Sequence, residues 1–288
     1  MIGFGPNSVV CTTMEPCWII IPTYNRRHIL ERTISHYLQV GAPLLVVDDG
    51  SQDGTDEWLR GLGVRVVRHE RRRGVAAARN TGLKSVNSPW VLFGEDDVLM
   101  PQGQHQLLLA AAAHLPRVGA VCGLSYVTDT WSLERGIPGP ALLDPTLLLA
   151  EHSLVPAGPI LLPTLHSRSL INREAALGVG GFDESFLDSA FREESDFFAR
   201  LWRGGWGCWM VPDTWEVHVR HRLGGGCRGK RGVVPKLFNR WSYWRNDCRF
   251  IDRHWRLWNH FAPVSFPGTL KARSFANIAR RALEAAWT

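Results

Sequence analysis

The sequence predicts an α/β protein with a parallel sheet that helices cover on both faces. Four short apolar runs recur within the first hundred residues, and amphipathic segments of helical period separate them. Polar or acidic residues follow three of the four runs at the point where each run ends. Strands that alternate with helices form parallel sheets, and a parallel sheet is buried on both faces.

The apolar runs are rich in β-branched residues and are bounded by Gly, Pro, Asn or Asp, as buried strands are. They predict strands at 18–21, 44–47, 64–67 and 90–93. The segments between them predict helices at 26–40, 53–62 and 75–86. In the first of these helices, Ile29, Leu30, Ile34, Tyr37 and Leu38 fall on one face.

The length of 288 residues and the 45% hydrophobic content are typical of one large domain, alone or with an extension. Residues 1–16 lack the basic start and apolar core of a signal peptide, and no apolar run approaches the ~18 residues of a membrane span. We therefore expect a cytoplasmic protein. Six cysteines without CxxC spacing predict reduced thiols rather than a zinc site or a disulfide framework.

The net charge of +6 is divided unevenly along the chain. Residues 219–288 contain 15 Lys and Arg against three acids, so this segment carries +12 and the remainder carries −6. Five tryptophans lie among these basic residues. This mixture predicts contact with an anionic membrane surface. A nucleic-acid surface has a similar composition, and a helical tail that packs on the domain with its arginines exposed is the simpler alternative.

Three adjacent acids, Glu95, Asp96 and Asp97, follow the fourth apolar run. Like charges repel, so these three adjacent acids predict a cation among them, most simply a divalent metal with oxygen ligands. The alternative is a solvated turn in which Asp97 caps a helix after Pro101. Asp48 and Asp49 follow the second run, and the parallel geometry places both acidic segments at one edge of the sheet.

Six segments in order resemble the family 2 glycosyltransferases, which are nucleotide-sugar enzymes with the GT-A fold. These segments are IPTYNR (21–26), VVDDGSQDGT (46–55), RGVAAARNTGL (73–83), GEDDVLMP (94–101), GGFDESF (180–186) and EESDFFARLWRGG (193–205). The resemblance implies a mixed, mainly parallel sheet in a catalytic domain at 17–222. Its nucleotide-binding half would be 17–123 and its acceptor-binding half 124–222, between an N-terminal arm (1–16) and a basic, Trp-rich helical extension (223–288).

The resemblance implies roles for individual residues on the donor side. Those expected to border the nucleotide are Pro22, Thr23, Tyr24, Asn25, Asp49, Arg79 and Glu95. Asp49 resembles the carboxylate that accepts a hydrogen bond from the base, and Glu95 the acid at the ribose. Arg79 would reach phosphate or form a structural salt bridge; both readings stay open.

The metal motif departs from the family pattern. Counting back from Pro101 places Gly94 where the family has its first acid, and it places Asp96 at the position of the metal ligand. His218, or else His221, would complete the coordination of Mn²⁺ or Mg²⁺.

The resemblance also places the general base and the acceptor side. Inverting transfer needs one carboxylate to take the acceptor proton, and that position falls on Glu194, where the family more often has Asp. The alternative is that the acids at 193–196 only favour the first turn of a helix. Residues expected on the acceptor side are Asp97, Gly181, Phe182 and Glu193.

The leading hypothesis is therefore an inverting, metal-assisted glycosyltransferase of polysaccharide or glycoconjugate synthesis. UDP-sugars are the default donor, ahead of GDP-mannose and dTDP-rhamnose, and the acceptor is a carbohydrate or a lipid-linked sugar. The rivals are a nucleotidyltransferase, a non-catalytic GT-A-like protein whose basic tail binds membrane or nucleic acid, and an inactive family member. The carboxylate clusters argue against a nucleic-acid-binding module, so we expect no nucleic-acid partner.

Overall fold

The structure is a computed structural model that describes residues 17–133, 137–138, 157–186, 192–219 and 233–261, with 268, 271–272 and 275. The expected arm at 1–16 lies outside this part. The helices are α1 (Arg27–Gln39), α2 (Thr55–Gly61), α3 (Val75–Ser85), α4 (Gln104–His114), α5 (Arg173–Gly178), α6 (Glu193–Arg203) and α7 (Val233–Phe261). The strands are β1 (Cys17–Thr23), β2 (Leu44–Asp48), β3 (Arg65–Arg68), β4 (Trp90–Phe93), β5 (Val98–Leu99), β6 (Val118–Thr128), β7 (Ile137–Pro138), β8 (Ile160–Leu161), β9 (Leu170–Asn172) and β10 (Gly207–Val219).

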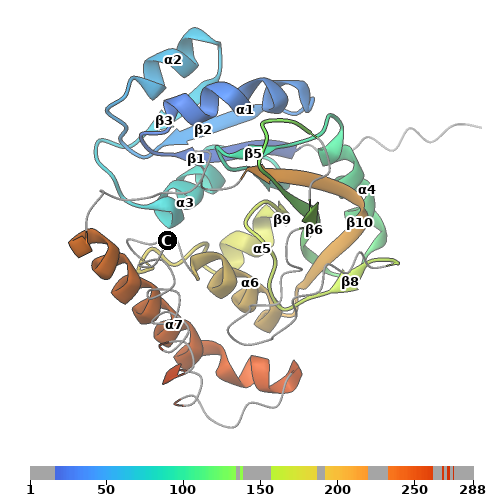
Figure 1. Cartoon of the computed structure of the whole chain (residues 1–288). Coiled ribbons are helices and arrows are strands. Elements are labelled where there is room, and N and C mark those ends of the chain that lie inside the picture. Colours follow the sequence, from blue (N-terminus) through green and yellow to red (C-terminus); the bar gives the residue numbers. More distant parts are fainter. Residues whose placement is uncertain are drawn as a thin grey trace, which may run out of the picture.

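The strands form one mixed sheet in the order β3-β2-β1-β4-β9-β6-β10-β5, with β7 beside β6 and β8 beside β10 (Figure 1). The first four strands of the chain pair in parallel, as the sequence predicts. β9 runs antiparallel to both β4 and β6 and so joins the two halves of the sheet. β10 runs parallel to β6, and the short strand β5 pairs with β10 in the antiparallel sense.

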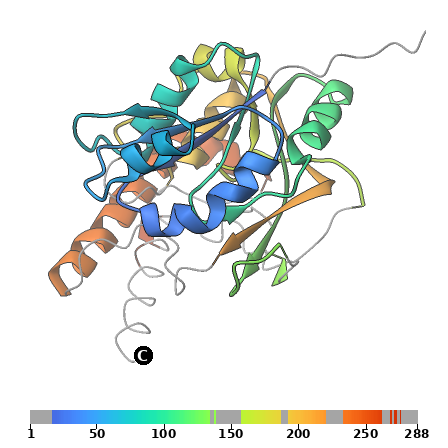
Figure 2. The ribbon, with the colours of Figure 1, turned by 90° about the horizontal axis from the view of Figure 1, so that it is seen from above.

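Alternate residues of the central strand face two separate hydrophobic cores. Ile19 and Ile21 pack with α1, α2 and α4, whereas Ile20 packs with α3, α5 and α6 on the opposite face. Successive side chains of a strand point to opposite faces, so an unbroken apolar run is what a strand with helices on both sides requires. The prediction of two covered faces is confirmed, and Figure 2 shows the helices on either side of the sheet.

The turn after β4 is not a helix cap. α4 begins at Gln104, and its N-cap is Gly103, which has a left-handed φ of 79°. Asp97 instead lies immediately before β5, where its backbone oxygen accepts a hydrogen bond from Val219 N at 3.0 Å. This position ties the acidic run to the end of β10, which carries His218.

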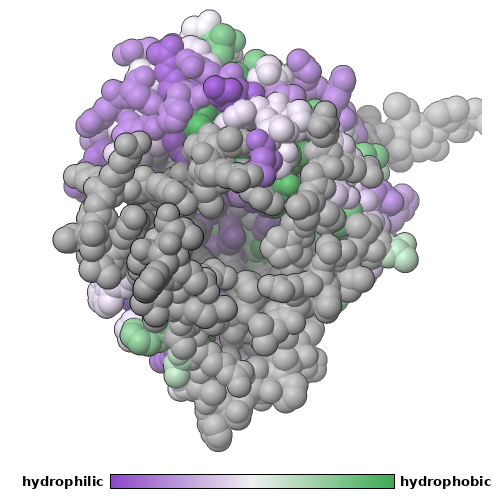
Figure 3. All heavy atoms as spheres, in the orientation of Figure 1, coloured by the Kyte–Doolittle hydropathy of each residue, from purple (hydrophilic) through white to green (hydrophobic). Residues whose placement is uncertain are grey.

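The C-terminal extension contains the long helix α7, which lies beside α6 in Figure 1. None of the described helices is long and apolar enough to cross a bilayer. Figure 3, in the orientation of Figure 1, shows hydrophilic side chains gathered over α1, α2 and β3. The domain boundaries at 16/17, 123/124 and 222/223 stay predictions.

Candidate active site

Three polar segments meet at the carboxyl edge of the parallel strands. Thr23 ends β1, Asp49 follows β2 and Glu95 follows β4. Asp49 N donates to Thr23 O at 2.9 Å, and Thr23 Oγ1 donates to Asp96 Oδ2 at 3.1 Å. The strand ends therefore form one continuous polar site, as the parallel geometry predicts.

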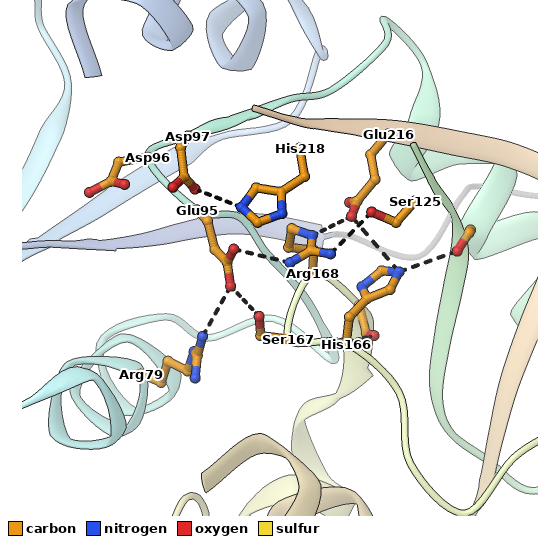
Figure 4. Close-up of polar contacts among 12 residues, drawn as sticks. Arg79, Glu95, Asp96, Asp97, Ser125, His166, Ser167, Arg168, Glu216 and His218 are labelled. Carbon is orange, nitrogen blue, oxygen red and sulfur yellow. Dashed lines mark hydrogen bonds and ion pairs between the residues drawn. The ribbon is translucent and has the colours of Figure 1, made fainter. Parts of the chain in front are cut away.

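Within this site, Glu95, Asp97 and His218 each offer a ligand atom within 4.8 Å of the others. Glu95 and Asp97 flank Asp96 in the turn before β5, where Val98 N donates to Glu95 O at 3.3 Å. His218 reaches them from β10, where it is in register with Val98 of β5, and its Nε2 lies 3.6 Å from Asp97 Oδ1 (Figure 4). Burial alone would lower the pKa of His218, but the Asp97 carboxylate raises it, so this position favours positive charge.

Glu95 is held by cations on two sides. Arg168 Nη1 lies 3.0 Å from its Oε2 and Arg79 Nη2 lies 3.4 Å from its Oε1, while Ser167 Oγ also donates to it (Figure 4). Burial alone would raise the pKa of Glu95, but the Arg168 guanidinium lowers it to about 2. Glu95 is therefore an anion at neutral pH.

Asp96 points away from His218 (Figure 4), contrary to the expectation that it joins the metal site. Its Oδ1 accepts from Arg26 Nε at 2.7 Å and its Oδ2 from Thr23. Arg26 Nη2 also donates to Asp97 Oδ2 at 3.0 Å. Burial raises the pKa of Asp96 to about 7 although Arg26 opposes the shift. Residues 96 and 97 form a turn, and this turn directs Asp96 toward Thr23 and Arg26 and Asp97 toward His218.

A buried layer behind this cluster escaped the sequence analysis. Arg168 Nε donates to Glu216 Oε1, and its Nη2 donates to Ser125 Oγ at 3.2 Å. His166 Nε2 donates to Gly123 O at 3.3 Å, and burial lowers the pKa of His166 to about 4, so the ring is neutral. One pattern in the sequence could have pointed to Glu216 as a site residue. It lies two residues before His218 on the same strand, so both side chains point to the same face of the sheet.

Asp49 is buried and heavily bonded. Its Oδ1 contacts His69 Nδ1 at 2.7 Å and accepts from Arg73 N at 2.8 Å, and its Oδ2 accepts from Gly74 N at 2.7 Å. His69 Nε2 contacts Thr81 Oγ1 at 2.8 Å on the other side. The sequence analysis found Asp49 but missed His69, whose only signal was its position directly after β3.

The other residues expected near the nucleotide lie at the end of β1 and in the loop after it. Pro22 and Thr23 are the buried last residues of β1. Tyr24 is half-buried, with the Arg72 guanidinium 4.8 Å from the centre of its ring. Asn25 has a left-handed φ of 52°, and its side-chain oxygen accepts from Gln52 N at 2.7 Å, which joins this loop to the one after β2.

Arg79 forms the buried salt bridge that was one of the two roles expected for it. Its Nη1 donates to Glu193 Oε1 at 2.8 Å, and both side chains are buried. Glu193 therefore faces Arg79 and not an open acceptor surface, unlike the expectation. Glu194 is half-buried. Burial raises the pKa of Glu194 to about 7, and repulsion from Glu193 adds to the shift, which is the range suited to a general base.

The loop with Gly181 and Phe182 is likewise structural. Phe182 is 1% exposed and stacks on Phe197 with ring centres 4.2 Å apart, so its ring has no free face for a sugar. Gly181 has a φ of 70°, and a Cβ there would lie 2.4 Å from Asn80 Oδ1. That oxygen accepts from Phe182 N at 2.8 Å, so Asn80 fixes the loop. His221 lies outside the described residues.

Residues 18–149 match the family described as Glycosyl transferase family 2. The chain is 24% identical over 231 residues to the poly-beta-1,6-N-acetyl-D-glucosamine synthase of Staphylococcus aureus strain COL, covering 74% of this chain and 55% of that protein. It is 34% identical over 121 residues to the validoxylamine A glucosyltransferase of Streptomyces hygroscopicus subsp. limoneus, covering 38% of this chain and 27% of that protein. The chain thus spans about half, or less, of the length of these curated relatives.

Two solved structures share the fold. GalNAc-T7 with UDP, GalNAc and Mn²⁺ superposes with a TM-score of 0.62 at 18% identity, covering 84% of this chain and 51% of that one. The mannosyltransferase PcManGT from Pyrobaculum calidifontis in complex with GDP-Man and Mn²⁺ gives a TM-score of 0.54 at 19% identity, covering 96% and 88%. The sheet and these two structures agree on the GT-A fold for the chain, and its residues 18–149 match glycosyl transferase family 2.

Proposed function

We propose that the chain transfers a sugar from a nucleoside diphosphate donor to an acceptor hydroxyl with inversion at the anomeric carbon. The observation that carries the proposal is the group of Glu95, Asp97 and His218 at the carboxyl edge of the sheet. Glu194 lies close enough that the charge of Glu95 raises its pKa. The family match and the two curated relatives support transferase chemistry over a nucleotidyltransferase or a non-catalytic protein.

Glu194 is the proposed general base. The acceptor hydroxyl must lose a proton as it attacks the anomeric carbon from the face opposite the leaving group, and one carboxylate suffices for this step. A pKa of about 7 leaves much of Glu194 ionised at neutral pH while keeping it basic enough to take the proton. Arg79 and Glu193 lie beside it and set the local charge.

The residues present fit a divalent metal. Two carboxylates and one imidazole are donors that suit Mn²⁺ or Mg²⁺, and their spacing lets one ion contact all three. Bound there, the ion would neutralise the charge that develops on the leaving diphosphate. We propose Asp97 as the ligand in place of Asp96, because Arg26 and Thr23 already occupy the Asp96 carboxylate. Glu95 would then be a metal ligand and not only a ribose contact.

The bonding of Asp49 favours a pyrimidine nucleotide. A carboxylate offers about four acceptor positions, and His69, Arg73 N and Gly74 N occupy three of those of Asp49. The remaining position suits the single N–H of uracil or thymine better than the paired donors of guanine. We therefore propose a UDP-sugar as the donor, with a dTDP-sugar next.

A carbohydrate or glycoconjugate hydroxyl is the proposed acceptor, in polysaccharide or glycoconjugate synthesis. The support is the names of the two curated relatives, a polysaccharide synthase and a glucosyltransferase. A lipid-linked sugar is the second form of the same acceptor.

We further propose a cytoplasmic location with peripheral attachment to an anionic membrane surface through residues 219–288. On α7, Trp241 is 52% exposed and the Arg245 guanidinium lies 5.3 Å from its ring centre. An exposed Trp with an Arg beside it suits the interface of an anionic bilayer. Sedimentation with phosphatidylcholine vesicles, with and without phosphatidylglycerol, tests this attachment at low salt. Protein left in the supernatant with both vesicle types would rule it out, and a Trp241→Ser variant should sediment less.

The transferase proposal is tested by calorimetric titration of UDP, dTDP and GDP with and without Mn²⁺. We expect UDP to bind only with metal. Asp97→Asn should weaken Mn²⁺-dependent binding by at least about tenfold, because it removes a charged ligand. Asp96→Asn, the matched control, should weaken it less. Equal losses in both variants would return Asp96 to the metal site, and no nucleotide binding under any condition would contradict the transferase proposal.

A further inference from the structure

The N-terminal end of α6, where Glu194 lies, is held by buried ion pairs to the C-terminal helix. Arg192 precedes α6 as its N-cap and adopts a left-handed φ of 75°, a costly conformation for a residue with a side chain. Its Nε donates to Asp247 of α7, and its guanidinium lies 5.1 Å from the ring centre of Phe250. All three side chains are buried, so the unusual backbone at residue 192 depends on contacts from α7.

A second connection lies on the other side of Glu194. Asp196 is fully buried in the first turn of α6. It interacts with His254 Nε2 at 2.9 Å and Arg253 Nη1 at 3.2 Å, both from α7, and with Arg200 Nε at 2.8 Å within α6. A buried carboxylate needs such partners, and two of these three come from the C-terminal extension.

α7 also binds the loop that ends at Phe186. Arg253 Nη1 lies 2.5 Å from Asp183 Oδ2, and Arg249 Nη1 donates to Ser185 Oγ at 3.0 Å. Phe186 packs with Phe250 in a small apolar cluster. One helix therefore fixes the chain at 183–186 and again at 192–196.

We infer that α7 positions the catalytic base, with Asp247 and His254 as the positioning residues. They act through Arg192 and Asp196, which lie two residues before and two residues after Glu194. The inference rests on the proposed role of Glu194 as the base. A helix that only docked for stability could bind anywhere on α6, whereas these contacts converge on the turn that carries the reacting carboxylate. A displacement of about 1 Å at such a group costs about 100-fold in rate, so loss of either contact should lower kcat.

The test compares full-length variants of α7. Asp247→Asn and His254→Leu remove the two contacts, and His254→Gln restores an N–H near the Nε2 position. Asp252→Asn is the matched control, because Asp252 lies on the same helix with its side chain 57% exposed and paired only with Lys271 among the described ion pairs. Arg253→Gln serves as a variant that should fold readily, since its side chain is 41% exposed.

Two readouts separate positioning from stability. Hydrogen exchange of the amides at 193–197 reports the turn directly and needs no substrate, and UDP release from UDP-N-acetylglucosamine reports kcat. We expect faster exchange and a kcat about 10- to 100-fold lower in Asp247→Asn and His254→Leu, with Mn²⁺-dependent UDP affinity within about twofold of the unmodified protein. His254→Gln should recover most of kcat, Arg253→Gln should show a smaller loss, and Asp252→Asn none.

Unchanged exchange at 193–197 in the variants that fold would overturn the inference, as would a wild-type kcat with only a lower melting temperature. If Asp247→Asn and His254→Leu do not fold, the comparison of Arg253→Gln with Asp252→Asn decides by the same two readouts. A Glu194→Gln variant that keeps full activity would contradict the proposed base, while the exchange result would still show whether α7 orders this turn.

Discussion

Gly94 occupies the position where the family usually has an acid, and the structure predicts that no side chain fits there. A Cβ on residue 94 would lie 2.7 Å from Cε1 and from the hydroxyl oxygen of Tyr37 and 2.9 Å from Cζ. Tyr37 is fully buried, and its hydroxyl donates to Glu95 O at 2.7 Å and accepts from Glu95 N at 3.0 Å. Gly94→Ala therefore forces the ring to move and breaks both hydrogen bonds.

The expected cost follows from these contacts. Two lost hydrogen bonds contribute about 1 kcal/mol each, and overpacking contributes about 1–3 kcal/mol. Allowing for partial relaxation, we expect Gly94→Ala to lower the free energy of unfolding by about 2–4 kcal/mol. At about 2–4 °C per kcal/mol, the melting temperature should fall by about 4–16 °C. Mn²⁺ binding should weaken as well, because Tyr37 holds the backbone of Glu95.

Chemical denaturation and thermal melting measure the change, with Gly61→Ala as the matched control. A Cβ on Gly61 would meet nothing within 4 Å, so this control should keep its stability within about 0.5 kcal/mol. Tyr37→Leu removes the atoms that clash, so Gly94→Ala should cost less in a Tyr37→Leu background than alone. The reasoning would be refuted if Gly94→Ala behaved like Gly61→Ala, or if the two substitutions added without coupling.

Three further outcomes are expected. Glu194→Gln should lower kcat by about 10²- to 10⁴-fold. In the unmodified protein, kcat/KM should fall about tenfold per pH unit below the pKa of about 7, because Glu194 becomes protonated there. A flat pH profile of kcat/KM from pH 5 to 8 would exclude Glu194 as the general base. Phe182→Ala should lower the free energy of unfolding by about 3–5 kcal/mol, as expected for a core ring, and denaturation like that of a surface variant would contradict its buried stacking. His69→Ala should weaken Mn²⁺-dependent UDP binding in calorimetry. His69→Asn can still donate to Asp49 and should retain most of this binding. Equal UDP affinities of the two variants would show that His69 does not orient Asp49.

The first half of the fold could be predicted from sequence because its signals are local. The predicted strand at 90–93 coincides with β4, and the predicted helices at 26–40 and 75–86 match α1 and α3 to within one residue at each end. Buried parallel strands require unbroken apolar runs, and the residues that end them are polar because they face the site. Such information lies within a few residues of each element.

The second half needed contacts that no local pattern carries. Phe182 follows two glycines and resembled a loop aromatic free to stack on sugar, but Phe93 of the distant strand β4 and Phe197 of the next helix enclose it. The pair of Arg168 and Glu216 was missed for the same reason, because β9, α5 and α6 separate its members along the chain. Arg192 and Asp247 are a further pair of this kind, brought together only by the packing of α7 on α6.

The acidic run shows how the local and the long-range information combine. Three adjacent carboxylates predicted a cation among them, and the structure supplies cations on two sides. The turn before β5 directs Glu95 and Asp97 toward His218 and Asp96 toward Arg26. Counting from Pro101 assumed that the family spacing is kept and assigned the metal ligand to Asp96, whereas the structure brings Glu95 and Asp97 together with His218. The direction of each side chain in this turn is fixed by contacts with β1 and β10, which are distant in sequence, so no count along the acidic run contains it.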